Sequence, residues 1–252
     1  MRTNMKTIII TLTLLSITGI HSLTAQEDTV AETILEQVDR NLSAQTRIFE
    51  SSMTIHGRRT SRTVTSKSWS RGESAALTEY RSPASEAGTK MLKLEDQLWI
   101  YTPLADRTIQ ISGHMLRQSV MGSDLSYEDM MDDRKLTEVY SAEVIAQDTL
   151  RDTRVLVLQL TARLTDVAYP TQKMWIDAEK FVPLRQEMYA RSGQLLKRID
   201  LFDVKRIQDR WFPTRMIYKD MLKTGGGTEF SISSMVFDAQ IPEYIFSKAS
   251  LR

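Results

Sequence analysis

The chain has 252 residues, with 33 basic and 32 acidic side chains, 13 methionines and no cysteine. A charge balance this close to neutral argues against nucleic acid or heparin as the main partner, because proteins that bind such polyanions carry a clear basic excess. Without cysteine no disulfide can form, so a hydrophobic core must supply the stability, and the chain is long enough to build one.

The first 25 residues are predicted to be a secretory signal peptide. Arg2 and Lys6 precede the apolar run Thr7–Ile20, and Leu23–Thr24–Ala25 follows as a plausible cleavage site. The apolar run is too short for a comfortable membrane span, and no second long apolar run follows it. Residues 26–252 are therefore expected to be one soluble, exported domain, with no cysteine to carry a lipid anchor.

One amphipathic helix is predicted next, from about Thr29 to Leu42. Thr29 and Glu32 have the spacing of a capping box, which marks a helix start. The residues that follow form an apolar stripe at helical spacing: Val30, Ala31, Ile34, Leu35, Val38 and Leu42. Such a helix needs an apolar surface to lie against.

From residue 47 onward, apolar and polar residues alternate, as they do in strands that bury one face. Turn-rich clusters separate the predicted strands, for example Glu95–Asp96–Gln97 and Thr224–Gly227. The strands are Arg47–His56, a segment ending at Trp69, Ala75–Tyr80, Met91–Leu94, Leu98–Thr102, Arg107–Ser112, Leu136–Gln147, Arg154–Leu164, Lys173–Asp177, Phe181–Ala190, Leu195–Val204, Trp211–Leu222 and Thr228–Phe237. Short turns between many strands predict a mainly β fold: one antiparallel sheet that must curl into a barrel-like shape.

Residues 115–131 (MLRQSVMGSDLSYEDMM) interrupt the strands and hold four of the methionines. The segment has too many acids and serines for a core helix. A single helix of about four turns cannot cover the inner face of so large a sheet. Either the sheet packs on itself as an ordinary core, or it encloses a cavity shared with the helix and this segment; the pattern alone leaves both open.

No catalytic residue is predicted. The mature chain has two histidines, His56 and His114, and no G-x-S-x-G nucleophile motif. Gly225–Gly227 lies between strands and is followed by no G-K-[ST], so it is a hairpin turn and not a phosphate loop. A carboxylate pair for glycoside hydrolysis meets only in space, so a secreted hydrolase stays open as an alternative.

No metal or cofactor is predicted either. An acidic cluster lacks the alternation and central glycine of an EF-hand loop and has no softer ligand beside it. Its members are Asp124, Glu128, Asp129, Asp132 and Asp133. We interpret them as helix-start and solvent-facing residues, since Ser126–Asp129 itself has capping-box spacing.

Several strings resemble the LolA-like outer membrane lipoprotein-sorting protein family, over nearly the whole mature chain. They are GTKML at 88–92, DQLWIYTP at 96–103, Arg107, QSVMGSDLSYED at 118–129, KMWID at 173–177, FVPLR at 181–185, WFPT at 211–214, IP at 241–242 and FS at 246–247. The resemblance implies an incompletely closed antiparallel β-barrel in the periplasm, with an apolar cavity under a short helical lid. The family's archetype holds its lid closed with an arginine, and Arg81 stands in a roughly comparable place.

The resemblance also implies a function. The expected protein binds lipid or lipoprotein acyl chains and moves them towards the outer membrane, between an inner-membrane exporter and an outer-membrane acceptor. Each acyl methylene exposed to water costs about 0.8 kcal/mol, so such chains need a reversible shield. The alternative is a LolA-like sensor or accessory subunit of an envelope transporter or stress-signalling complex.

The predicted binding residues fall into two groups. Trp99 and Tyr101 are expected near the mouth of the cavity. The lid is expected to contribute Met115, Leu116, Val120, Met121, Leu125, Met130 and Met131. Methionine suits such a lining because its unbranched side chain can repack around cargo or around none.

Overall fold

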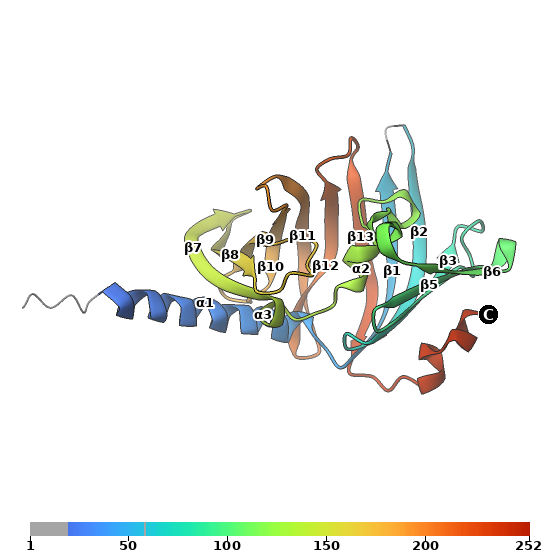
Figure 1. Cartoon of the computed structure of the whole chain (residues 1–252), viewed down its shortest axis with the longest axis horizontal. Helices are drawn as coiled ribbons and strands as arrows, with labels where there is room; N and C mark the ends of the chain where they lie inside the picture. Colours follow the sequence, from blue (N-terminus) through green and yellow to red (C-terminus); the bar gives the residue numbers. More distant parts are fainter. Residues whose placement is uncertain (1–19, 58) are drawn as a thin grey trace, which may run out of the picture.

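A computed structural model describes residues 20–57 and 59–252, with the side chains of the first helix described from Thr29 onward (Figure 1). The predicted signal peptide, residues 1–25, therefore lies mostly outside the described residues. No helix in the described part of the chain is both long enough and apolar enough to cross a bilayer.

Thirteen strands form a single antiparallel sheet, which confirms the predicted mainly β fold. The strands are β1 (Thr46–His56), β2 (Ser61–Arg71), β3 (Ala75–Ser82), β4 (Lys90–Leu94), β5 (Gln97–Thr102), β6 (Arg107–Ile111), β7 (Tyr140–Leu150), β8 (Thr153–Ala162), β9 (Thr171–Asp177), β10 (Pro183–Tyr189), β11 (Leu195–Ile207), β12 (Arg210–Asp220) and β13 (Gly227–Phe237). Their order across the sheet is β6-β5-β4-β3-β2-β1-β13-β12-β11-β10-β9-β8-β7.

Almost every strand therefore pairs with its neighbours in sequence. The exception is the pairing of β1 with β13, which runs from Arg47 opposite Phe237 to His56 opposite Gly227 and joins two meanders into one sheet. The edge strands, β6 and β7, follow one another in the chain, yet no pairing joins them within the described residues. The sheet is thus not closed by hydrogen bonds, as predicted, and the gap falls between β6 and β7.

The first helix, α1 (Ile20–Leu42), covers one end of this sheet. It starts before the predicted Thr29, so the capping-box interpretation was wrong: the Thr29 carbonyl accepts a hydrogen bond from Thr33 Oγ1 inside the helix (2.9 Å), and Glu32 pairs with Arg163. The stripe packs as expected, except that Val30 is 51% exposed. Its buried residues, Ala31, Ile34, Leu35 and Val38, form one cluster with Tyr140, Ala142, Leu158, Leu160, Met174 and Ile176 of β7, β8 and β9.

Short helical turns occupy the remaining connections. Two are α-helical, α2 (Tyr127–Met131) and α3 (Leu136–Val139). The others are the 3₁₀ turns η1 (Pro103–Ala105), η2 (Gly113–Arg117), η3 (Val120–Gly122), η4 (Glu243–Phe246) and η5 (Lys248–Leu251). The predicted strand Leu136–Gln147 therefore begins as a helical turn, and β7 starts only at Tyr140.

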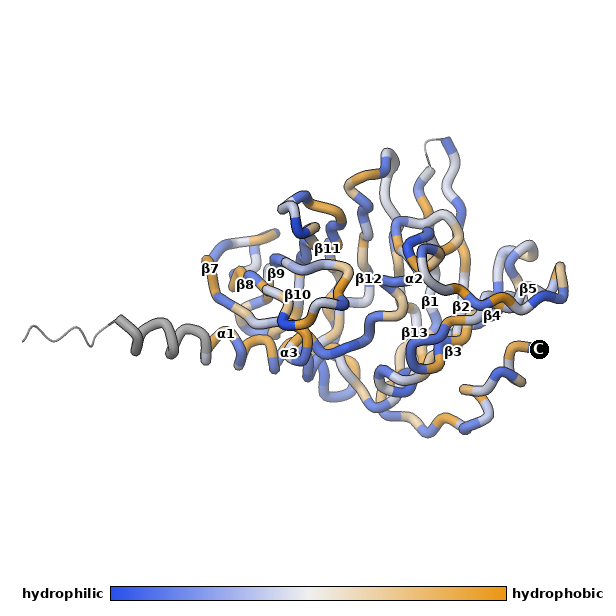
Figure 2. Tube along the Cα trace, in the orientation of Figure 1, coloured by the Kyte–Doolittle hydropathy of each residue, from blue (hydrophilic) through white to orange (hydrophobic). Residues whose placement is uncertain are grey.

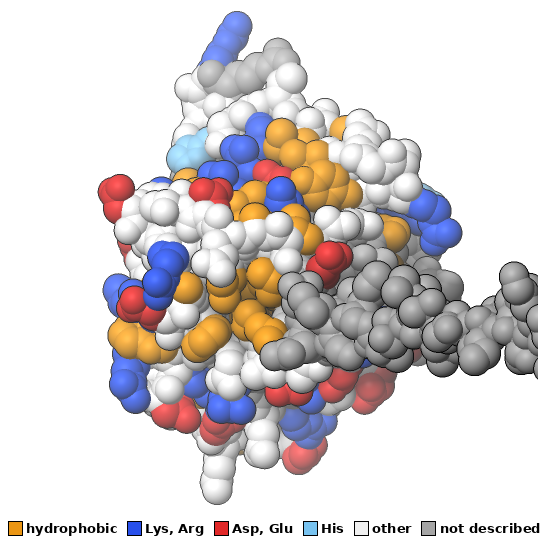
Figure 3. Space-filling view, turned by 90° about the vertical axis from the view of Figure 1, so that its left-hand side faces the viewer, with side chains coloured by type: hydrophobic (Ala, Val, Ile, Leu, Met, Phe, Trp, Pro, Cys, Tyr) orange, Lys and Arg blue, Asp and Glu red, His pale blue; other side chains and the backbone are white. Residues whose placement is uncertain are grey.

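Hydrophobic and hydrophilic residues are interspersed along the strands (Figure 2). The sheet has two faces, because successive side chains of a strand point to opposite sides. On β5, Leu98 points to the concave face and Trp99 to the outer one. On the outer face Trp99 packs with Leu77, Leu92 and Leu251, and η4 and η5 cover this cluster. At the side formed by the β7 edge, hydrophobic side chains gather in the middle of the surface, with charged ones around them (Figure 3).

Candidate functional site

Residues 112–139 connect the two unpaired edges of the sheet, and we call them the lid segment. They comprise η2, η3, α2, α3 and the turns between them. The segment lies on the same face of the sheet as α1, and an isolated bridge between Ser119 and Ser126 folds its middle part back on itself. The site therefore has a wall, the concave face of the sheet, and two separate covers: α1 and the lid segment.

The apolar side chains of the lid segment pack onto strands β1 to β6. Leu125 is buried in a cluster with Met53, Val64 and Tyr80, and Met121 and Met130 pack against it. A neighbouring cluster consists of Met91, Leu98 and Ile111, against which Met115, Leu116, Tyr127, Met130 and Met131 pack. Met130 belongs to both clusters and joins them into one apolar layer under the lid.

The structure thus brings together six of the seven residues predicted for the lid, and it buries the seventh, Val120, outside these two clusters. Val120 and Leu125 are buried, at 1% and 7% exposed, whereas the methionines and Leu116 are half-buried. Met121 adopts a left-handed backbone conformation, with φ at 50°, which is uncommon for a non-glycine residue. The half-buried side chains fill the space in front of β1 to β6, and Leu125 is part of the buried core there.

The other two predicted residues do not join them. Trp99 is 6% exposed on the outer face, packed against Leu251, with the Lys248 ammonium 4.0 Å from its ring centre. Tyr101 packs against the same outer cluster, and its hydroxyl donates to Asp106 (3.2 Å). The structure therefore separates Trp99 and Tyr101 from the concave face.

Polar contacts fasten the lid segment, and Asp129 makes several of them. Asp129 completes a capping box with Ser126 at the start of α2, accepting from the Ser126 N–H at 2.6 Å. Its carboxylate also pairs with Lys197 of β11 and accepts from the Tyr169 hydroxyl (2.6 Å). Burial and then the Asp129 charge raise the pKa of Tyr169, so this phenol stays protonated and remains a donor.

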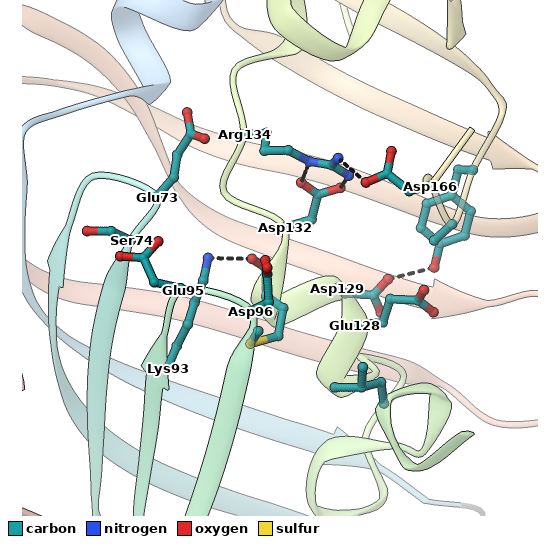
Figure 4. Close-up of a pocket in the computed structure, with 14 residues that line it drawn as sticks. Glu73, Ser74, Lys93, Glu95, Asp96, Glu128, Asp129, Asp132, Arg134 and Asp166 are labelled. Carbon is teal, nitrogen blue, oxygen red and sulfur yellow. Dashed lines mark hydrogen bonds and ion pairs between the residues drawn. The ribbon is translucent and has the colours of Figure 1, made fainter. Parts of the chain in front are cut away.

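Further charged contacts follow immediately along the chain, and Figure 4 shows those of Asp132, Arg134 and Asp166. Arg134 Nε lies 2.8 Å from Asp132, and its Nη1 lies 3.3 Å from Asp166 in the loop between β8 and β9. Strands β1 and β4 also hold this part of the lid segment. Arg47 of β1 pairs with Asp133 (3.0 Å), and Lys93 of β4 donates to the Met131 carbonyl (2.5 Å).

The apex of the lid segment is held by a third group of contacts. Arg62 of β2 donates to the Met121 carbonyl (2.5 Å), and Lys223 donates to the Ser123 carbonyl (2.8 Å) and to the Ser119 hydroxyl. Asp124 is buried and exchanges hydrogen bonds with Thr228 of β13. Hydrogen bonds and ion pairs from both halves of the sheet thus hold the lid segment along its length.

Between the lid segment and strands β9 to β12 lies an open cavity of ≈ 600 Å³. Its sheet wall is apolar apart from Gln186, and is formed by Met174, Ile199, Leu201, Phe212, Met216 and Tyr218. Its other wall is mostly polar: Asp129 and residues 132–135 of the lid segment line it together with Asp39, Arg47 and Glu73, and Leu42, Ala44 and Leu136 are its apolar members. A second cavity of ≈ 230 Å³ shares Ile199, Gln186 and Tyr218 with the first and continues it towards Met188 and Lys197.

The cleft drawn in Figure 4, of ≈ 440 Å³, lies beside this cavity and shares Glu73, Asp129, Asp132 and Arg134 with it. Its lining comes from the turn after β2, the turn after β4, the lid segment and the loop before β9. Seven of its lining residues are acidic and only Lys93 and Arg134 are basic. The approach to the cavity is therefore negatively charged on this side.

The chain is similar to one family model and to several solved structures. A family model whose description reads "Uncharacterized protein" matches residues 72–252. A LolA superfamily protein from Nitrosomonas europaea is 26% identical with a TM-score of 0.71, and the match covers 87% of this chain and 98% of that one. A protein assigned as an outer membrane lipoprotein-sorting protein domain, from Vibrio parahaemolyticus, is 25% identical with a TM-score of 0.77, covering 89% and 99%.

The chain belongs to the LolA-like family. A DUF1329 family protein from Desulfovibrio piger, 21% identical over 90% of this chain and 99% of that one, shares the fold with a TM-score of 0.81. A comparison with curated proteins gives no match.

In this LolA-like protein the residues that hold the lid segment differ from the arginine considered from the sequence. Arg81 pairs with Glu50 at 3.2 Å, and both side chains are about half exposed, at 49% and 45%. Lys93, which is buried, and Lys197, which is half-buried, both meet the lid segment, and no local sequence pattern marks either of them. The capping-box spacing of Ser126 and Asp129 was the one usable signal for the contact of Asp129 with Lys197.

Most of the acidic residues considered above as metal ligands form hydrogen bonds or ion pairs with other side chains. Within the described residues, no group of three His, Cys, Asp or Glu side chains is arranged to hold a metal ion. Asp124, Asp129, Asp132 and Asp133 each accept from or pair with another part of the lid site. Of the histidines, His56 bonds to the Ser61 hydroxyl (3.1 Å) and His114 is exposed.

Proposed function

We propose that this LolA-like protein is a periplasmic carrier that binds lipid or lipoprotein acyl chains on the concave face of its sheet and moves them towards the outer membrane. The observation that supports this proposal best is the contrast between the two walls of the cavity. An apolar wall opposite a polar, separately fastened lid suits an amphiphile, with its chain on the sheet and its polar end towards the lid segment. We propose no catalytic step.

The dimensions of the cavity fit this role. Small-molecule sites typically occupy about 300–1,000 Å³, so a cavity of ≈ 600 Å³ has room for a ligand before the lid moves. Displacing the lid segment would add the apolar surface that its side chains now cover, including Met53, Met91 and Leu98. The binding surface would then extend across both halves of the sheet.

Within this proposal, the seven lid residues have two roles. In the closed form they fill the space in front of β1 to β6, and in the open form they contact the acyl chain. Trp99 and Tyr101 have no part in it, because they lie on the outer face. We further propose that an inner-membrane exporter delivers the cargo and that an outer-membrane acceptor receives it.

Filling the cavity tests the proposal. Ile199 lines both cavities and is 8% exposed, so Ile199→Trp would occupy space that a ligand needs without adding a charge. We expect the affinity for a fluorescent fatty acid to fall at least tenfold, measured by titration. Lys205→Trp adds the same bulk to an exposed position of the same strand and should leave the affinity unchanged.

Equal affinities in the two variants would rule out this cavity as the binding site. Native mass spectrometry of the protein purified from its own periplasm distinguishes the roles more broadly. Co-purified lipid or acylated protein supports the carrier. A consistently empty protein that captures an inner-membrane partner would instead support the sensor or accessory subunit.

A further inference from the structure

The turn between β12 and β13 exposes two consecutive apolar side chains. Met221 is 39% exposed and Leu222 is 64% exposed, although both stand among charged residues. Figure 1 shows this hairpin projecting from the sheet beside the hairpin of β1 and β2. A hydrogen bond from Gly226 N–H to the His56 carbonyl (3.2 Å) joins the two hairpins at their tips. The apolar pair therefore sits on a raised, supported tip.

Basic side chains surround this tip. Lys219 and Lys223 flank the apolar pair, and the Lys219 ammonium is held over the turn by the Gly225 carbonyl (2.6 Å). Arg117 of the lid segment is exposed and lines the same cleft as Leu222 and Lys223. On the neighbouring hairpin Arg59 is exposed as well. Cations thus approach the tip from three different parts of the chain.

Two nearby carboxylates, Asp220 and Asp124, are engaged within the protein, whereas Glu128 lines the cleft with Arg117. Asp220 accepts from the Leu222 N–H (3.0 Å) and lies 3.5 Å from Lys223. Asp124 is buried and accepts from Thr228 and from the Asp220 N–H. The outward surface of the tip therefore presents apolar and basic groups together.

We propose that the β12–β13 tip docks the protein on an anionic membrane surface. Apolar side chains flanked by lysine and arginine enter the boundary between headgroups and acyl chains, while the cations contact the lipid phosphates. This inference goes beyond the carrier function and does not depend on it, because the tip lies outside the cavity. Each basic residue near such a surface raises the affinity roughly fivefold.

The tip also touches the lid segment. The Lys223 ammonium that would meet a lipid phosphate is the group that holds the Ser123 carbonyl and the Ser119 hydroxyl in the closed form. Arg62, which holds the Met121 carbonyl, comes from the strand that follows Arg59. A phosphate surface therefore competes with the lid segment for Lys223 and for the arginines nearby, so docking would weaken the contacts that hold the lid segment closed.

Co-sedimentation of the purified chain with lipid vesicles tests this inference. We expect binding to vesicles of phosphatidylcholine with about a third phosphatidylglycerol at low salt, and little binding to phosphatidylcholine alone or at high salt. Leu222→Gln should weaken the binding about tenfold and Lys219→Glu at least fivefold. Leu104→Gln is the matched control, because Leu104 is 80% exposed in a turn elsewhere, between β5 and β6.

The co-sedimentation results either support or overturn the docking proposal. Equal effects of Leu222→Gln and Leu104→Gln, binding that ignores the anionic lipid, or no binding by the folded chain would overturn the inference. All these substitutions lie at exposed or partly exposed positions, and circular dichroism checks that the variants fold. The cavity variant Ile199→Trp should still dock, so a failure of the carrier proposal and a failure of the docking proposal are separable.

Discussion

Two covers lie on the same concave face of the sheet, and they are attached in different ways. Helix α1 is attached by apolar side chains that are almost fully buried, with Leu35 and Val38 at 0% exposure. The lid segment has fewer buried apolar side chains, Val120, Leu125 and Val139, and it depends more on ion pairs and hydrogen bonds around half-buried methionines. Exposing a buried apolar side chain to water costs a large amount of free energy. An exposed or half-buried polar group that loses its partner can instead form a hydrogen bond with water or with another group.

The difference separates a permanent part of the core from a part that can move. Regions that open locally are those with few buried apolar contacts and many polar ones. Opening the lid segment would uncover one half of the sheet while α1 keeps the other half folded. A carrier needs both properties in one molecule, since it must release its cargo without unfolding.

The largest expected effect concerns α1. Leu35→Ala removes a fully buried side chain, and such substitutions cost about 2–5 kcal/mol because they leave a cavity. We expect the free energy of unfolding in urea to fall by that amount. Val30→Ala, at the exposed position of the same helix, should change it by less than about 0.5 kcal/mol. Similar small effects at both positions would mean that α1 is not part of the core.

A smaller and more local effect is expected in the lid. Asp129→Ala removes the partner of Lys197 and Tyr169, whose side chains are mostly buried, and leaving such groups unpaired costs about 1–3 kcal/mol. We expect the amides of α2 to exchange with deuterium correspondingly faster, while those of α1 keep their protection. Asp166→Ala is the control carboxylate, because Asp166 is 75% exposed and its removal should change little. Uniformly faster exchange over both covers would contradict the distinction between them.

The smallest effect on stability is expected from the methionines. Replacing Met121, Met130 and Met131 by leucine keeps the volume, and each such change costs less than about 1.5 kcal/mol. The range of ligands should narrow instead, because leucine repacks less readily than methionine. Competition titrations with straight and cis-unsaturated fatty acids measure this. An unchanged preference would show that the methionines are ordinary packing residues.

Local features of the fold followed from the sequence. Glu95 and Asp96 separate β4 from β5 where the turn pattern predicted them. The pairing of β1 with β13 was not predictable in the same way, because the two strands are far apart in the chain and no turn links them. The helix start was misplaced since threonine hydrogen-bonds inside helices as well as at their ends, as Thr33 does here.

The candidate site was predicted less completely, for reasons of geometry. Alternation along β5 puts Leu98 and Trp99 on opposite faces, yet it does not say which face is concave, and the large aromatic side chain lies outside. Lys197 and Asp129 are 68 positions apart, and neither has a local pattern that marks it as half of a pair. The cavity wall around Ile199 and Met216 carries the same alternation as any packed strand, so nothing distinguished it.

The seam between β1 and β13 has a consequence for how the protein is made. Residues 46–56 precede residues 227–237 by most of the chain, so during synthesis or export the first strand emerges long before its partner. A waiting strand edge is a template for aggregation unless its residues discourage it. The neighbouring strand β2, SRTVTSKSWSR, has only Val64 and Trp69 as apolar residues. The β1–β2 hairpin that waits for this partner therefore has one strongly polar strand, which discourages aggregation of the hairpin until the seam closes.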